Sequence, residues 1–292
     1  MSYTNIDIQT IGFEAKQVLG RNTSLEIFGT SSRGVYLQTA NDMTLFVSSE
    51  EFHGPLTLNV VGDLEGFLEI SPRTIADITG NSILFPGPKL ALSFNDSEIW
   101  TPAPPPKFKG LRQNILADLF QQSVLLAGDN PFFPLLEMAL TSKSLPLPGF
   151  PDFFRRMIFL NKSIQTGEAS NLTWELENLL GAGPGLTPLG DDLILGILLA
   201  LNRGIKSPIP ESYLEKLNQG VIDLALDKTT RLSFSLLVCA ADGSADQRLI
   251  QVLDSLLSGA PIKDKELTQL LRWGSTSGFA VLAGMILALS AR

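Results

Sequence analysis

The sequence has very few residues of the types that most often carry out catalysis or bind metals. It contains one cysteine, Cys239, and one histidine, His53, among 292 residues. One cysteine cannot form an intramolecular disulfide, and one histidine with one cysteine cannot assemble an ordinary structural zinc site. No Ser-His-Asp set can be built without a role for His53 that nothing else supports. So few thiols are typical of the reducing cytosol, and we expect a cytoplasmic location.

Positive charge is also scarce. There are 22 Lys and Arg residues against 30 Asp and Glu residues, which gives a net charge of −8. A surface that neutralises phosphates needs the opposite sign, so we expect no nucleic acid partner. The first residues lack both a basic region and an apolar region, so the sequence predicts no signal peptide.

Long hydrophobic runs are missing, although hydrophobic residues make up 44% of the chain. The two most apolar stretches, Leu193–Leu201 and Phe279–Leu289, fall short of the roughly 20 residues that a membrane-spanning helix needs. We therefore expect no membrane partner and interpret both stretches as buried core helices.

The first part of the chain has the pattern of short β-strands. Up to Trp100, apolar residues alternate with polar ones in segments separated by Gly, Asn, Asp and Pro. The predicted strands are Ser24–Gly29, Gly34–Gln38, Met43–Ser48, Leu56–Val61, Gly66–Ile70, Ser82–Phe85 and Lys89–Phe94. A helical turn is predicted at Ile75–Thr79. This pattern predicts a small antiparallel β domain, either a sheet or a barrel.

A proline-rich segment separates this part from the rest. Four of the seven residues from Thr101 to Lys107 are prolines, which neither a helix interior nor a central strand tolerates. We therefore predict two domains, residues 1–105 and 106–292.

The second domain has helical periodicity, with apolar residues three and four positions apart. The predicted helices are Leu111–Ala127, Phe132–Ser142, Phe153–Gln165, Asn171–Leu180, Asp191–Arg203, Pro210–Leu226, Thr230–Ala241, Asp246–Ser258, Asp264–Trp273 and Phe279–Ala291. The fold class is therefore α+β, with a small β domain followed by a larger, mainly helical domain.

The strongest chemical signal is a glycine-rich loop, residues 181–190, that leads into an apolar helix. Gly183, Gly185 and Gly190 cost backbone entropy, which a chain usually accepts where the backbone turns sharply or approaches a ligand. Thr187 is predicted to cap the helix, with Pro188 as its first residue. Free N–H groups at such a helix start form an anion-binding site.

Two carboxylates, Asp191 and Asp192, follow directly and leave several roles open. They favour the helix dipole but repel an anion. One role is to hold Mg²⁺ that bridges to an anionic ligand, and a second is acid/base chemistry or orientation of a substrate amide. A third is simple capping. Mg²⁺ is the one cofactor that Asp191 and Asp192 suggest.

Two further segments resemble the first loop in their chemistry. Ser275, Thr276 and Ser277 precede the last apolar helix and offer hydroxyl groups. The segment 228–231 contributes Lys228, Thr229, Thr230 and Arg231 to the start of another helix, and Arg231 is suited to binding a carboxylate or phosphate. Each has a plain interpretation as a helix cap or a solvated basic surface. Together, the three helix starts predict one shared pocket for a small anionic metabolite.

The loop sequence resembles that of a known protein family. The run from Gly183 to Gly196 is similar to the signature of proteins long filed as a domain of unknown function, which include the AllH-type subunit of oxamate carbamoyltransferase from allantoin degradation. The segments 229–233, 275–278, 282–284 and 54–57 are similar in order and approximate spacing.

The resemblance implies one subunit of a multi-subunit transferase that interconverts carbamoyl phosphate plus oxamate with oxalurate plus phosphate. It therefore implies other protein subunits as partners, and a homo-oligomer is a further possibility. An alternative remains open, in which the chain is a non-catalytic sensor or scaffold that binds a small carboxylate or phosphate.

Overall fold

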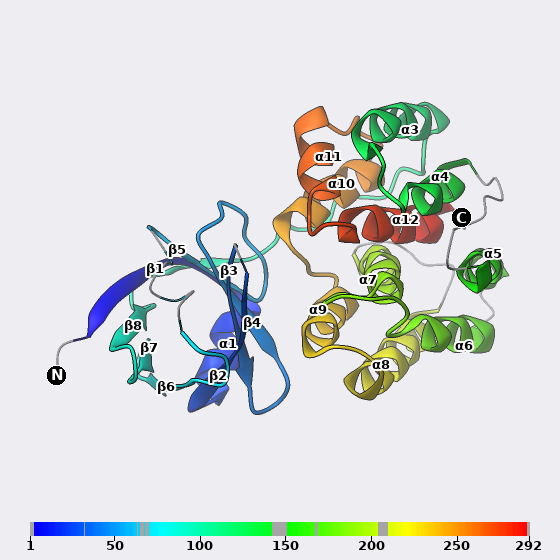
Figure 1. Cartoon of the computed structure of the whole chain (residues 1–292). Coiled ribbons are helices and arrows are strands. Elements are labelled where there is room, and N and C mark those ends of the chain that lie inside the picture. The colour runs from blue at the N-terminus through cyan, green and yellow to red at the C-terminus, as the bar shows by residue number, and fades with distance from the viewer. Residues whose placement is uncertain are drawn as a thin grey trace. The chain divides into compact units, whose positions relative to one another are not determined.

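The computed structural model describes residues 3–31, 33–62, 64, 67, 70–141, 151–166, 169–203 and 210–290. The chain forms two compact units, residues 1–103 and 104–292. The first is built mainly from strands, and the second is built from helices (Figure 1). The expected α+β fold class is therefore confirmed.

The strands of the first unit form one sheet that closes on itself. They are β1 (Thr4–Gly12), β2 (Ser24–Ser31), β3 (Gly34–Thr39), β4 (Thr44–Ser48), β5 (Thr57–Val60), β6 (Ile75–Thr79), β7 (Ser82–Phe85), β8 (Leu90–Ser93) and β9 (Glu98–Trp100). The order is β5-β4-β3-β2-β6-β7-β8-β1-β9, and an additional β5–β1 pairing closes the first eight positions into a barrel. Most pairs are antiparallel, but β1–β8, β1–β9 and β4–β5 are parallel.

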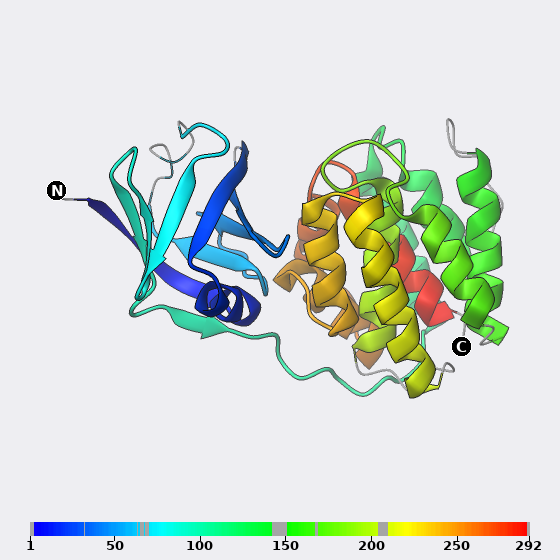
Figure 2. The same cartoon turned by 90° about the horizontal axis from the view of Figure 1, so that it is seen from below.

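Apolar side chains fill the barrel because successive residues of a strand point to opposite faces. Val35 and Leu37 of β3 and Leu45 and Val47 of β4 are fully buried. A short helix, α1 (Phe13–Arg21), packs beside β1 and β9 (Figure 2). The interior of the barrel is thus packed with apolar side chains.

Two sequence predictions for this unit differ from the structure. The helical turn expected at Ile75–Thr79 is wrong, because this segment is β6, joined to β7 by the hairpin residues Gly80 and Asn81. Gly80 adopts a φ of 59°, which the hairpin requires. Strands β1 and β9 and helix α1 were not predicted. The strand expected at 66–70 lies partly outside the described residues, and the two described members, Phe67 and Ile70, are not in a strand.

The second unit contains the ten predicted helices within the described part of the chain. They are α3 (Gln113–Ala127), α4 (Phe133–Thr141), α5 (Pro151–Thr166), α6 (Ala169–Leu179), α7 (Leu189–Asn202), α8 (Glu211–Lys228), α9 (Arg231–Ala241), α10 (Gln247–Ser258), α11 (Asp264–Leu271) and α12 (Ser277–Ser290). Figure 1 shows α7 and α12 in the middle of this unit, with the other helices around them.

Helices α7 and α12 cross at glycine, which explains how two backbones approach so closely. A Cβ atom at Gly196 of α7 would lie 2.1 Å from the carbonyl oxygen of Val281, and one at Gly284 of α12 would lie 2.2 Å from that of Leu193. Almost every residue of both helices is buried. The predicted buried core helices are confirmed, and within the described residues no helix is long and apolar enough to cross a membrane.

Candidate functional site

The glycine-rich loop joins α6 to α7, and its last residues differ from the predicted cap. Pro188, with a φ of −52° and a ψ of 145°, is the cap residue, and Leu189 begins the helix. The Thr187 side chain does not cap the helix. Instead its Oγ1 lies 2.9 Å from Oγ of Ser277, the first residue of α12. Thr187 therefore connects two helix starts.

Close backbone packing explains two of the loop glycines. Gly181 has a φ of 74°, and a Cβ atom there would lie 2.2 Å from the carbonyl oxygen of Lys228. A Cβ atom at Gly190 would lie 1.9 Å from the carbonyl oxygen of Leu179. Gly183 and Gly185 also have positive φ values, but a Cβ atom at Gly185 would meet no atom within 4 Å. Packing therefore explains Gly181 and Gly190, but not Gly185.

Asp191 faces the α8–α9 connection. Its Oδ1 accepts a hydrogen bond of 2.7 Å from the N–H group of Gly181, and its Oδ2 accepts one from the Thr229 hydroxyl. Burial raises the pKa of Asp191, against the opposing effects of Gly181, Thr229 and Ser233. Ser233 was not predicted as a neighbour from the sequence. It lies in the first turn of α9, three residues after the cap residue Thr230.

Asp192 faces α12 and is less well satisfied. The residue is 2% exposed, and its Oδ2 has no hydrogen-bond partner among the described residues. Burial raises the pKa of Asp192 well above its ordinary value, and the negative charge of Asp191 adds to that rise. Hydrogen bonds with the hydroxyls of Ser277 and Thr187 act in the opposite direction. This carboxyl group is therefore the clearest candidate for contact with a ligand.

The third helix start is also tied to the loop. Thr230 caps α9 by accepting a hydrogen bond of 3.1 Å from the Ser233 N–H group, and its hydroxyl donates to the carbonyl oxygen of Leu186 at 2.6 Å. The starts of α7, α9 and α12 therefore meet around residues 186–192. We refer to this region as the three-helix junction.

The two cations predicted to bind an anion lie at the edge of this junction. We expected Lys228 to begin a helix, but it is the last residue of α8, where a cation favours the helix dipole. Its Nζ donates to the carbonyl oxygen of Glu177 at 3.1 Å, at the end of α6. Arg231 begins α9, and its Nη1 donates to the carbonyl oxygen of Leu226 at 2.7 Å. Both cations thus hold the ends of neighbouring helices.

Backbone amides at the junction mostly have partners already. The N–H group of Gly190 donates to the carbonyl oxygen of Ala182, and those of Asp191 and Asp192 donate to that of Pro188. At the start of α12, the Gly278 N–H group donates to the carbonyl oxygen of Trp273. The expectation of several free N–H groups is therefore not met at these positions. Among the hydroxyls, Ser275 is exposed, Thr276 is half-buried and Ser277 is buried.

The magnesium hypothesis gains no support from the number of ligands. Within the described ranges, no three His, Cys, Asp or Glu side chains lie close enough to hold a metal ion together. Both oxygens of Asp191 already accept hydrogen bonds. Asp192 is therefore the member of the pair with an oxygen left for a ligand.

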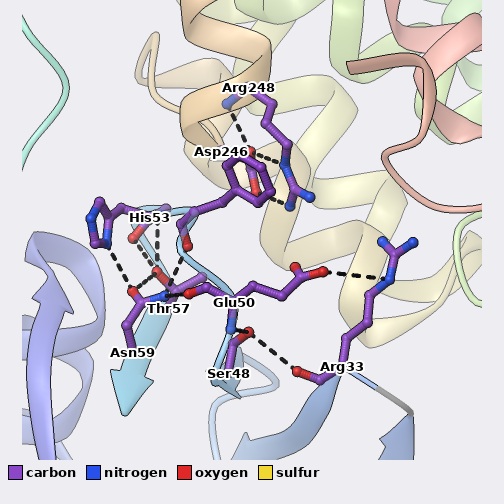
Figure 3. A network of polar contacts seen from close by, with 10 residues as sticks. Arg33, Ser48, Glu50, His53, Thr57, Asn59, Asp246 and Arg248 are labelled. Atoms are coloured by element: carbon purple, nitrogen blue, oxygen red, sulfur yellow. Dashed lines mark hydrogen bonds and ion pairs between the residues drawn. The ribbon is translucent and has the colours of Figure 1, made fainter. Parts of the chain in front are cut away.

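His53 belongs to a different network, in the barrel unit (Figure 3). Its Nδ1 lies 3.1 Å from Oδ1 of Asn59, and Nδ2 of Asn59 donates to the carbonyl oxygens of Glu50 and Phe52. In the next residues, the Gly54 N–H group donates to the Thr57 hydroxyl at 2.7 Å. These contacts order the loop before β5, which agrees with a structural role for His53.

The fold and the site together define a two-unit α+β protein whose helical unit gathers two buried aspartates at a junction of helix starts. The family model for oxamate carbamoyltransferase subunit AllH matches residues 179–289, a segment that contains every residue of the junction. The resemblance to this family is thus confirmed over that segment. Comparisons with curated proteins and with solved structures gave no match.

Proposed function

We propose that this chain is a subunit of a carbamoyltransferase, and that its three-helix junction binds the small carboxylate substrate. The observation that supports the proposal most directly is the position of Asp191 and Asp192. Both are buried at the point where three helix starts meet, inside the segment that matches the oxamate carbamoyltransferase subunit model. Buried acids with raised pKa values are typical of functional sites.

The α9 side of the junction would bind the anionic part of the substrate. Lys228 and Arg231 supply positive charge there. The Thr229 and Thr230 hydroxyls donate to Asp191 and to the carbonyl oxygen of Leu186, and so hold the start of α9 against the loop. Arginine offers five N–H donors in a planar fork that suits a carboxylate, and one of those of Arg231 donates to the carbonyl oxygen of Leu226. Around the rim, Gly183, Gly185, Thr187 and Gly190 of the loop and Ser275, Thr276 and Ser277 before and in α12 would complete the site.

The chemistry would proceed by attack of the substrate amide nitrogen on the carbonyl carbon of carbamoyl phosphate. A C–N bond forms, the C–O bond to phosphate breaks, and the nitrogen loses one proton. With one histidine and one cysteine in the chain, an aspartate is the acceptor that we propose for that proton. Catalysis would then depend on positioning and on hydroxyl and cationic groups that stabilise the developing oxyanion.

The test uses the full chain together with its partner subunits, isolated from its own cells through a tag on this chain. Phosphate release is measured from carbamoyl phosphate with oxamate, with and without Mg²⁺, and binding of each compound is measured by calorimetry. Phosphate release that requires oxamate is the expected result. Binding without turnover would favour the non-catalytic alternative, and the absence of both would overturn the proposal.

A further inference from the structure

Asp192 carries an unsatisfied oxygen in a place that water reaches poorly. The residue is 2% exposed, and Oδ2 has no hydrogen-bond partner among the described residues. The Ser277 and Thr187 hydroxyls act on the same carboxyl group from the α12 side. Since buried polar atoms are nearly always paired, an unpaired oxygen of this kind calls for a partner from outside the chain.

The groups around Asp192 indicate which chemical group that partner must supply. At this junction the N–H groups of Gly190, Asp192 and Gly278 already donate to backbone carbonyls. The Thr187 and Ser277 hydroxyls, whose two oxygens lie 2.9 Å apart, do not supply a donor to Oδ2 either. A partner for Oδ2 therefore has to supply a hydrogen-bond donor of its own.

The negative charge of the two aspartates favours an uncharged donor at Oδ2 over an anionic group. The carboxyl group of Asp191 lies near enough to raise the pKa of Asp192, so a negative group at Oδ2 would be repelled by both aspartates. Lys228 and Arg231 donate to the carbonyl oxygens of Glu177 and Leu226, on the α8–α9 side. An uncharged N–H donor on the α12 side avoids the repulsion.

We propose that Oδ2 of Asp192 accepts a hydrogen bond from an amide N–H group of the ligand, and so selects a primary amide or carbamoyl group over a carboxylate of the same size. This inference rests on the proposed function, which places the ligand at the junction. The ligand then lies with its anionic end toward α9 and its amide end toward α12. Asp191 has both oxygens engaged and does not take part in this selection.

The raised pKa of Asp192 agrees with this assignment. Burial is the largest cause of the rise, because the carboxylate loses water and gains no replacement at Oδ2. A ligand N–H group at that atom would replace the lost solvation. Thr187, which acts on the same carboxyl group, directly follows the exposed loop residues 184–186.

Oxamate and oxalate form a matched pair for the test, because oxamate has an amide group where oxalate has a second carboxylate. The tagged chain with its co-purifying subunits is titrated with each compound by calorimetry, and the ratio of the two dissociation constants is compared between variants. In the unmodified protein oxamate should bind more tightly by about tenfold or more, the expected effect of one hydrogen bond to a charged group.

Asp192→Asn is nearly isosteric but presents an N–H₂ group as well as a carbonyl oxygen, so the preference for oxamate should fall to near equality or reverse. Ser277→Ala, which loosens the orientation of the carboxyl group, should reduce the preference without abolishing it. Asp242→Asn is the matched control. It changes another acid whose pKa burial raises, at the opposite end of α9, and should leave the ratio unchanged.

The outcomes separate this inference from the proposed function. An unchanged ratio in Asp192→Asn, or equal affinity for both compounds in the unmodified protein, overturns the inference while the proposed function stands. Mg²⁺ alone stabilising the unmodified protein but not Asp192→Asn also overturns it, because a cation would then occupy Oδ2. If neither compound binds, the proposed function itself fails.

Discussion

Asp191 and Asp192 are adjacent in the sequence, yet their carboxyl groups face different helices. Asp191 bonds with the hydroxyl of Thr229, just before α9, whereas Asp192 contacts Ser277, the first residue of α12. Successive residues of an α-helix are turned by about 100°, so neighbours on one helix reach different partners. The pair therefore divides the junction into two sides with different chemistry.

The buried charge of Asp192 predicts how stability depends on pH. Its pKa is raised in the folded state, so the stabilisation from its neutral form is complete below the unfolded value and is lost as pH rises through the folded value. The free energy of unfolding should therefore fall as pH rises above about 4, the ordinary pKa of an aspartate, and through the raised pKa of Asp192. In Asp192→Asn this part of the dependence should be missing. Urea denaturation of both proteins at several pH values measures it.

Asp264→Asn provides the control for that series, because Asp264 also lies in the first turn of a helix but is exposed. Its pH dependence should match that of the unmodified protein. A pH profile of Asp192→Asn identical to that of the unmodified protein would show that Asp192 carries no such penalty.

The crossing of α7 and α12 predicts a large effect of one methyl group. Gly196→Ala places a Cβ atom 2.1 Å from the carbonyl oxygen of Val281, so the helices must separate. We expect a loss of about 3 kcal/mol in the free energy of unfolding of the helical unit. Thermal and urea denaturation followed by circular dichroism test this.

Gly220→Ala is the matched substitution in α8. The nearest atom to a Cβ there is Cγ2 of Thr173, at an ordinary 3.9 Å, so the higher helix propensity of alanine should dominate. A gain of up to about 1 kcal/mol is expected. Equal effects at the two glycines would contradict the packing argument.

Arg203 and Asp254 predict a second stability effect, independent of the junction. Nε and Nη2 of Arg203 donate to the two carboxylate oxygens of Asp254 at 2.7 and 2.9 Å, and Arg203 is 4% exposed. Asp254→Asn removes the negative charge that accepts both of these hydrogen bonds from a buried guanidinium, and should cost about 3 kcal/mol. By contrast, Lys263→Gln removes an exposed ion pair with Glu266 and should cost less than about 0.5 kcal/mol. Chemical denaturation of the two variants compares these costs.

For the α9 side of the junction, Arg231→Gln should weaken oxamate binding by about tenfold, because a charge-assisted hydrogen bond is lost. Calorimetry on the complex measures the change. Lys265→Gln, an exposed cation on α11, keeps the overall charge change the same and should have no effect. If Arg231→Gln binds oxamate as tightly as the unmodified protein, the anionic end of the ligand lies elsewhere.

The sequence predicted the helical unit well because its signal is local and repeated. Apolar stretches and three- and four-residue spacing identify α7 and α12 directly. The barrel was harder to predict from the sequence. Strand β1 has a bulge between Ile8 and Thr10, which interrupts the alternation by which strands are recognised. The segment Ile75–Thr79 is short enough that its pairing with β2, far away in the sequence, decides its conformation.

Many residues of the three-helix junction stand out in the sequence, but their contacts do not. Paired aspartates after a glycine-rich loop stand out in the sequence, as do the hydroxyl-rich segments before α9 and α12. The partners of Lys228 and Arg231 are backbone carbonyls of Glu177 and Leu226, and no sequence pattern marks a carbonyl oxygen as an acceptor. The divergence of Asp191 from Asp192 likewise depends on where α9 and α12 pack.

Strand β1 has a consequence for the speed of folding. It pairs with β5 through Ile8 and Val60, with β8 through Thr4 and Leu90, and with β9 through Thr10 and Glu98. All three partners are distant in the sequence, and contacts of that kind slow folding because the chain must close long loops before it gains from them. During synthesis β1 therefore cannot complete its pairing until β5, β8 and β9 have been made. The barrel should form late and all at once, while the helices of the second unit can form from local contacts.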